Sequence, residues 1–228
     1  MKIKYLYNSG FSLETENYLF VFDYFKDSAE GTIKDHINCS KNIIVFCSHS
    51  HGDHFNPEIF EWRKQAPCIK YVLSSDIMLD FIAPNIYFMS SGQEFALDGV
   101  FVKAYGSTDL GVSFVVKFED NVIFHAGDLN CWYWFDESPE ENQIAEAAFK
   151  QEVEKLKADW GGQVDIAFFP VDPRLKDKYD MGVRHFVKEI KPSWLVPMHF
   201  GDHYQAIEGI EESLKKLDVK ILNPEKLV

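Results

Sequence analysis

Short runs of apolar, β-branched and aromatic residues, broken by turn residues, fill the first half of the chain. Such runs of about four to eight residues are typical of β-strands. The run Asn42–Cys47 is continuously apolar after its first residue, which predicts a strand buried on both faces. The strands predicted here are 3–7, 11–14, 18–23, 42–47, 69–73, 86–89, 94–96, 100–104, 112–118 and 122–125. Segments 57–64 and 76–82 are predicted to be helices between them.

The second half alternates between helical and strand patterns. An apolar stripe among charged residues predicts a long helix over 140–158. The segments that follow are predicted as strand 164–168, helix 181–190, strand 194–196, helix 206–217 and strand 219–222. A block of strands followed by helix–strand alternation indicates an α/β fold, in which two packed sheets carry helices on their outer faces. The absence of repeats and polar linkers favours a single domain over residues 1–228.

Composition narrows the classes of function. The chain has 23 Lys and Arg against 36 Asp and Glu, a formal net charge of −13. An acidic surface disfavours binding to nucleic acid or to an anionic membrane. No stretch approaches the roughly 20 apolar residues of a membrane span, and the N-terminus lacks the pattern of a signal peptide. The four cysteines form no CxxC pair, so we expect a cytoplasmic protein with reduced thiols.

Candidate chemistry is concentrated in Ser48–His54, which contains the pattern HxHxDH directly after an apolar run. In an extended backbone the side chains of His49 and His51 point the same way. Asp53 and His54 follow Gly52, which permits a tight turn, and can face a second ion. Imidazole and carboxylate ligands suit zinc, and also iron, manganese and cobalt. The alternative is a solvated polar loop that happens to be rich in histidine.

This pattern resembles the signature of the metallo-β-lactamase superfamily. Phe124–Asp128 resembles the family's segment in which an aspartate follows a glycine at a strand end, and Val196–Phe200 resembles its last motif. Leu19–Asp23 resembles the early strand that ends in an aspartate behind the site. Within that superfamily the chain most resembles the small single-domain branch that includes ascorbate-6-phosphate lactonase. It implies a four-layer αβ/βα sandwich and a hydrolase that uses one or two divalent ions, zinc first and manganese or iron as alternatives.

The resemblance also implies a role for each ligand. His49 and His51 would bind a first metal, Asp128 would bridge, and a second metal would be bound by Asp53, His54 and His199. Asp53 would also orient the attacking water or take its proton, which makes it the predicted catalytic residue. An outer carboxylate such as Asp23 would fix the orientation of a histidine. The alternatives are that Asp128 lies in a simple turn and that His199 is a satisfied core histidine.

The family pattern breaks at one position. A third histidine normally completes the first metal position from a loop, and the corresponding loop here, Tyr105–Gly111, has none. We therefore expect a weaker first position, or one completed by water, by Asp109 or by substrate. The alternative is that Ser107–Asp109 only form a turn, since Ser, Asp and Gly are turn residues.

Further residues are candidates for contact with a small-molecule substrate. The aromatic run Trp132–Phe135 either walls the pocket, packs as a lid on the core or forms an oligomer contact. Arg174 follows a predicted strand and can hold a carboxylate or phosphate, although a surface ion pair is the simpler interpretation. The candidate substrate contacts are Thr108, Asp109, Trp132, Trp134, Arg174 and His203, the last of which also fits a helix start.

Four functions remain open from the sequence. The first is hydrolysis of a small ester, lactone or phosphoester by a metal-activated water. The others are a phosphodiesterase or nuclease, a non-catalytic metal- or ligand-binding protein with an incomplete first site, and an iron-based redox role. Association into a homo-oligomer is compatible with each of them.

Overall fold

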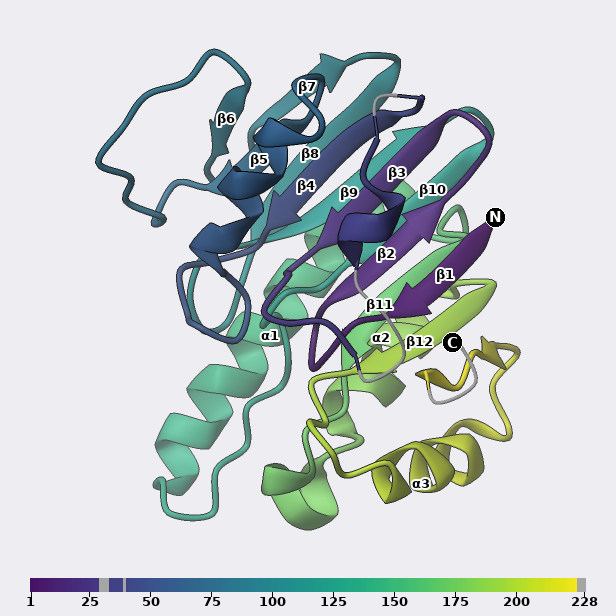
Figure 1. Ribbon diagram of the computed structural model, residues 1–228. Helices are drawn as coiled ribbons and strands as arrows, with labels where there is room; N and C mark the ends of the chain where they lie inside the picture. The colour runs from purple at the N-terminus through teal and green to yellow at the C-terminus, as the bar shows by residue number, and fades with distance from the viewer. Residues whose placement is uncertain (29–32, 39, 225–228) are drawn as a thin grey trace.

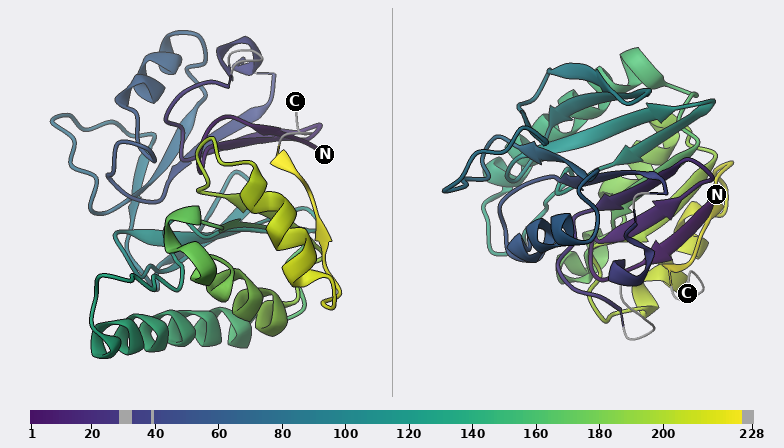
Figure 2. Two further views of the ribbon diagram at one scale, coloured as in Figure 1. Left: turned by 90° about the horizontal axis from the view of Figure 1, so that it is seen from below. Right: turned by 45° about the horizontal axis from the view of Figure 1, so that its top comes forward.

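The computed structural model describes residues 1–28, 33–38 and 40–224, and two β-sheets packed face to face form its centre (Figures 1 and 2). The first sheet has the strand order β1-β2-β3-β4-β5-β6. Its strands are β1 (Lys2–Tyr5), β2 (Phe11–Glu14), β3 (Tyr18–Phe22), β4 (Asn42–Cys47), β5 (Lys70–Ser74) and β6 (Ile86–Met89). The strands from β3 to β6 run parallel to one another, whereas β1, β2 and β3 form antiparallel pairs.

The second sheet has the strand order β13-β12-β11-β10-β9-β8-β7. Its strands are β7 (Glu94–Leu97), β8 (Val100–Gly106), β9 (Val112–Phe118), β10 (Asn121–His125), β11 (Ile166–Pro170), β12 (Trp194–Met198) and β13 (Lys220–Ile221). The strands from β7 to β10 are antiparallel neighbours, and those from β10 to β13 are parallel. The expected α/β sandwich of two sheets is therefore confirmed.

Alternate residues of the continuous apolar strands enter two different cores, because successive side chains of a strand point to opposite faces. In β4, Ile44 and Phe46 face the cluster shared with the second sheet. Ile43 and Val45 face a smaller cluster on the outer side of the first sheet. The prediction that this strand is buried on both faces is confirmed.

The two outer layers differ in kind. Three α-helices cover the second sheet: α1 (Pro139–Trp160), α2 (Met181–Ile190) and α3 (Gln205–Leu214) (Figure 2). Ser138 and Glu141 form a capping box that starts α1. The outer face of the first sheet is covered instead by the 3-10 helices η1 (Ile33–His36) and η2 (Pro57–Lys64). The predicted helix at 57–64 is thus present as a 3-10 helix.

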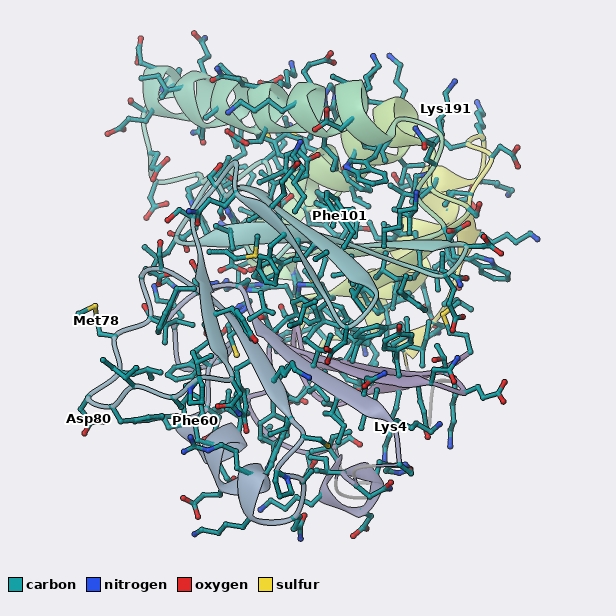
Figure 3. All side chains as sticks on the ribbon, turned by 90° about the horizontal axis from the view of Figure 1, so that it is seen from above. Lys4, Phe60, Met78, Asp80, Phe101 and Lys191 are labelled. Carbon is teal, nitrogen blue, oxygen red and sulfur yellow. The ribbon has the colours of Figure 1, made fainter. Side chains whose placement is uncertain are left out.

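One predicted helix is wrong. Residues 76–82 form no helix, although their sequence has a helical apolar pattern. Asp76 accepts a hydrogen bond from the backbone of Ser50, and Ile77 alone of this segment is buried. Met78 and Ile82 are almost fully exposed, and Met78 extends away from the molecule in Figure 3. Without a surface to pack against, a helical pattern gains little stability.

Smaller differences concern strand ends and cysteines. The strand predicted at 164–168 lies at 166–170, and the 3-10 helix η3 (Pro173–Lys178) was not predicted. Cys47 and Cys131 are buried free thiols, whereas Cys68 is disulfide-bonded, so the expectation of reduced thiols throughout is wrong. Disulfide pairing depends on proximity in space, which the spacing of cysteines along this chain does not reveal. Over the described residues, none of the helices combines the length and apolar character needed to span a bilayer.

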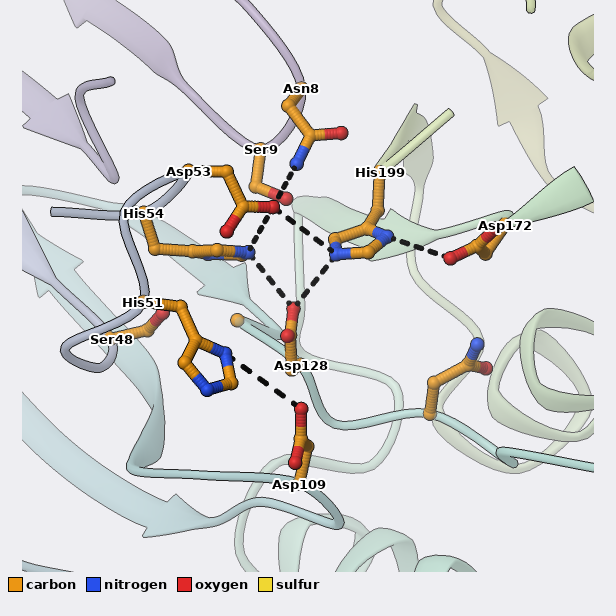
Figure 4. Close-up of polar contacts among 12 residues, drawn as sticks. Asn8, Ser9, Ser48, His51, Asp53, His54, Asp109, Asp128, Asp172 and His199 are labelled. Carbon is orange, nitrogen blue, oxygen red and sulfur yellow. Dashed lines mark hydrogen bonds and ion pairs between the residues drawn. The ribbon is translucent and has the colours of Figure 1, made fainter. Parts of the chain in front are cut away.

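The parallel strands position the chemically active side chains. Asp23 follows β3, the segment Ser48–His54 follows β4, and the segment ending in Asp128 follows β10. Asp172 and His199 follow β11 and β12. Because the carboxyl ends of parallel neighbours meet at one edge of a sheet, these loops from both sheets come together at the same edge of the sandwich (Figure 4).

Candidate metal centre

Asp128 lies at the centre of the cluster that the sequence predicted. Its Oδ2 lies 3.4 Å from His49 Nε2. Its Oδ1 lies 3.2 Å from His54 Nε2 and 3.4 Å from His199 Nε2 (Figure 4). The two oxygens of one buried carboxylate therefore face three histidines, two from the segment after β4 and one from the end of β12. Asp128 does lie in a turn, but this turn directs its carboxylate at the histidines, so the geometry favours the predicted ligand roles of Asp128 and His199 over the alternatives.

Asp53, His54 and His199 form one half of the cluster. Asp53 Oδ2 lies 3.7 Å from His54 Nε2 and 4.0 Å from His199 Nε2. The three ligand atoms all lie within 4.8 Å of one another, a spacing that a single cation can serve. Asn8 Nδ2 donates a hydrogen bond of 2.9 Å to Asp53 Oδ2 and so holds this carboxylate in place.

His49 and His51 lie on the other side of Asp128. His49 Nε2 and His51 Nδ1 are 3.0 Å apart. His49 is buried and His51 is about half exposed, with 49% of its side-chain surface accessible. The ligand atoms of His51, Asp109 and Asp128 also lie within 4.8 Å of one another. Asp109 thus lies in the region where a third histidine is missing.

Two buried atoms show that the cluster fits a cation. Asp128 Oδ1 and His54 Nε2 are shielded from solvent, yet neither makes a hydrogen bond within the described part of the chain. Buried polar atoms of native proteins are almost always paired, so an unpaired donor or acceptor calls for an explanation. A carboxylate oxygen and an imidazole nitrogen that face each other are both suitable ligands for a divalent cation.

Buried carboxylates and imidazoles of the cluster shift each other's pKa. Burial alone would raise the pKa of Asp128, but contacts with His49 and His54 hold it well below its usual range. Burial would lower the pKa of His54, but the carboxylates of Asp128 and Asp23 outweigh burial and raise that pKa to about 10. A site that already favours positive charge on its imidazoles is one that favours a cation in its centre.

Two outer carboxylates orient the histidines. Asp23 Oδ2 lies 2.7 Å from His54 Nδ1, which confirms the predicted contact of Asp23 with a histidine. Asp172 Oδ2 lies 3.1 Å from His199 Nδ1. In each case the opposite ring nitrogen points to the cluster, the arrangement by which outer carboxylates fix metal-binding histidines. Burial would raise the pKa of Asp172, but His199 and Arg174 lower it to about 2.

Backbone strain also marks this region. Asp23 and His199 both adopt positive φ angles, 42° and 62°. Such conformations cost about 1–3 kcal/mol each for residues with a side chain and are found preferentially at functional sites. Gly111, with φ of 73°, allows its loop to approach Ser48, because a Cβ there would lie 2.1 Å from the Ser48 carbonyl oxygen.

A cavity of about 420 Å³ opens onto the cluster. Trp132 and Trp134 stack 5.8 Å apart and form one wall, and the Trp132 ring lies 5.6 Å from His199. The indole nitrogen of Trp132 donates a hydrogen bond to the backbone carbonyl of Asp128. Of the alternatives for this aromatic run, the structure favours a pocket wall for the two tryptophans, whereas Phe135 is 46% exposed.

The other predicted substrate contacts divide between the cavity and its surroundings. Thr108, Asp109 and Arg174 line this cavity. Arg174 also forms an ion pair with Asp172, with its Nε 2.8 Å from Oδ2. Both interpretations of Arg174 therefore apply, since it makes an ion pair and also lines the pocket. His203 is exposed near the start of α3 and lines an adjoining cavity of about 290 Å³ together with Asp53.

Asn8 and Asp172 are the site residues that sequence reasoning missed. Asp172 carries a detectable signal, because it follows the strand that lies between those ending near Asp128 and His199. Asn8 lies in the turn between β1 and β2, which nothing in the local sequence connects to the HxHxDH segment.

Comparisons with known proteins agree with this geometry. A model of the beta-lactamase superfamily domain matches residues 2–199. A UPF0173 metal-dependent hydrolase of Pyrococcus horikoshii is 25% identical over 98% of this chain and 97% of its own length. A solved metallo hydrolase from Ignicoccus hospitalis shares the fold, with a TM-score of 0.65 at 17% identity over 97% of this chain and 94% of its own. With the family model matching most of its length, the chain belongs to the beta-lactamase superfamily.

Proposed function

We propose that this protein is a metal-dependent hydrolase of small esters, lactones or phosphoesters. The observation that carries the proposal is the cluster of six predicted ligands with Asp128 at its centre, in which two buried ligand atoms have no hydrogen bond among the described residues. The relatives from two Pyrococcus species, each 25% identical over nearly their whole length, are named metal-dependent hydrolases. These names support the reaction class and leave the substrate open.

The residues divide into two positions for a cation. His49, His51 and Asp128 would hold a first ion, and Asp53, His54, Asp128 and His199 would hold a second. A divalent cation bound there lowers the pKa of a water towards about 7 and polarises a carbonyl or phosphoryl oxygen. Zinc is the first expectation for a site rich in imidazoles, with manganese and iron as alternatives.

Asp53 is the proposed catalytic residue. Its side chain is 46% accessible and lines the cavity, whereas Asp128 is almost completely buried. Asn8 holds one carboxylate oxygen of Asp53. A carboxylate that is fixed by one oxygen at the wall of the cavity can orient a water molecule there and accept its proton.

The substrate is proposed to carry an anionic group beside a ring or acyl portion. Among the described residues that line the cavity, Arg174 is the only Lys or Arg. Its guanidinium lies 5.6 Å from the Trp134 ring, so a charged donor and an aromatic surface are side by side. The cavity of about 420 Å³ fits a small molecule rather than a polymer, and a net charge of −13 disfavours a nucleic-acid substrate.

The direct test measures turnover of a panel of esters, lactones, phosphomonoesters and phosphodiesters by the zinc- and manganese-loaded protein. We expect hydrolysis of at least one class, its loss with a chelator and its return when metal is restored. Absence of turnover by a protein that holds its metal would instead support a non-catalytic metal-binding role. A preference for nucleic acid with steep salt dependence would favour the nuclease alternative.

Replacing Arg174 by alanine is expected to raise KM for an anionic substrate about 10- to 100-fold, because hydrogen bonds to charged groups contribute about 1.5–3 kcal/mol. A neutral substrate of the same shape should be affected much less, and Arg174→Lys should restore part of the loss. Arg184→Ala is the matched control, since Arg184 is an exposed arginine that pairs with Asp180 away from the cavity. Equal losses for neutral and anionic substrates would contradict this role.

A further inference from the structure

Asp109 lies where the first metal position lacks its third histidine. Its Oδ2 is 3.9 Å from His51 Nδ1, and their ligand atoms lie within 4.8 Å of a ligand atom of Asp128 (Figure 4). His49 Nε2 is 3.0 Å from the same nitrogen of His51 and 3.4 Å from Asp128 Oδ2. The ligand atoms of His51, Asp109 and Asp128 therefore lie in one group, and His49 adjoins it through its contacts with His51 and Asp128.

The loop that carries Asp109 is fastened on both sides of the cluster. The hydroxyl of Thr108 accepts a hydrogen bond of 3.0 Å from the backbone nitrogen of Asn130, two residues after Asp128. The backbone nitrogen of Val112 donates to the carbonyl oxygen of Ser48, next to His49, at 2.9 Å. The loop is thus anchored to the two segments whose ligands it adjoins. A carboxylate whose loop is anchored beside the cluster is better placed to bind a cation than one on a mobile surface loop.

Asp109 also has little else to contact. Among the described residues, the side chain of Asp109 forms an ion pair with His51 and with no Lys or Arg. Its carboxylate is about half exposed, with 51% of its side-chain surface accessible, and it lines the cavity above the cluster. Of the alternatives for this position, namely water, Asp109, substrate and a simple turn, this geometry favours Asp109.

We propose that Asp109 supplies the ligand that replaces the third histidine, so that the first metal position consists of His49, His51, Asp109 and Asp128. This inference rests on the proposed metal-dependent function. Two carboxylates among four ligands make this position richer in oxygen than one with three imidazoles. Oxygen ligands suit manganese, whereas imidazoles suit zinc, copper and nickel. The first position therefore accepts manganese or iron as well as zinc, and its half-exposed ligands make it weaker than the buried position at His54 and His199.

The test counts ions rather than turnover. The full chain is loaded with zinc or with manganese, freed of excess ions, and analysed for metal per chain, and titration calorimetry gives the two affinities. We expect two zinc ions for the wild type and one for Asp109→Ala, with the weaker affinity reduced about 100-fold or more, since even the loss of an outer partner of a ligand costs 10- to 100-fold. Asp109→His should retain both zinc ions and lose much of the manganese affinity of the weaker position.

The control is Asp136→Ala, which removes an exposed aspartate outside the cluster and should leave both affinities unchanged. Circular dichroism and thermal unfolding show whether each variant is folded, and Asp109→Asn provides an isosteric second test. Two ions with unchanged affinities in Asp109→Ala, or one ion in the wild type, would overturn this inference and leave the hydrolase proposal intact. A folded wild type that takes up no transition metal would overturn the proposed function itself.

Discussion

Asparagine in place of Asp128 is expected to reduce hydrolysis by the metal-loaded protein about 1,000-fold or more. The two oxygens of Asp128 face histidines in both halves of the cluster, at 3.4 Å from His49 and at 3.2 and 3.4 Å from His54 and His199. The asparagine amide has nearly the same shape but lacks the charge, and its NH₂ group cannot bind a cation. Metal ions contribute several kcal/mol of transition-state stabilisation, and each factor of ten in rate corresponds to about 1.4 kcal/mol.

The measurement combines kcat with the number of bound ions in the same preparation. Asp120→Asn serves as the control, because Asp120 is exposed in the turn that leads into β10, the strand that precedes Asp128. Asp128→Asn should be folded, deficient in at least one ion and nearly inactive, whereas the control should match the wild type. Wild-type turnover with a full complement of metal in Asp128→Asn would show that Asp128 is not the shared ligand.

The parts of this fold that could be predicted are those encoded locally. The continuous apolar run of β4 predicted burial on both faces, and the density of histidines after it predicted the candidate metal-binding segment Ser48–His54. The helix predicted at 76–82 is wrong because a sequence pattern specifies an apolar face but does not show whether the fold provides a surface for that face to pack against. Met78 and Ile82 remain exposed for that reason.

The candidate ligand cluster was predictable from order along the chain, whereas of its supports only Asp23 was. Each ligand motif follows a strand, and the family resemblance supplied which strand ends meet. Asn8 and Asp172 act across long sequence separations, 45 residues to Asp53 and 27 to His199; Asn8 lies in a turn and Asp172 is the N-cap of η3, both common places for these residues. Asp109 could be named only as one of several candidates, since the sequence gives no distance between its loop and His51.

The second large effect is expected at Asp23. This carboxylate is fully buried and accepts hydrogen bonds from the Ser48 backbone nitrogen at 2.7 Å and the Ser48 hydroxyl at 2.6 Å, besides its contact with His54 at 2.7 Å. Asp23→Ala leaves these buried donors unpaired and should destabilise the metal-free protein by about 3–5 kcal/mol, as when one partner of a buried charged pair is removed. It also leaves a residue with little tolerance for positive φ at a φ of 42°.

Asp23→Asn distinguishes the effect of the charge from the effect of backbone strain. Asparagine tolerates this backbone conformation and keeps one acceptor oxygen, so it removes mainly the charge. Burial alone would raise the pKa of Asp23, but the imidazoles of His125 and His54 outweigh burial and hold it below its usual value. A carboxylate with a lowered pKa in the folded state stabilises the protein above its unfolded pKa, and this contribution is lost as the pH falls through the folded value.

Chemical denaturation of the metal-free protein between about pH 7 and pH 3 therefore tests the charge itself. The wild type should lose stability below about pH 4, while Asp23→Asn should start lower and lose less over the same interval. Asp35→Asn, at an exposed position in η1, is the control and should follow the wild type. Parallel curves for the wild type and Asp23→Asn would mean that Asp23 acts through shape alone. Converging curves would show that its charge contributes to the stability of the metal-free protein.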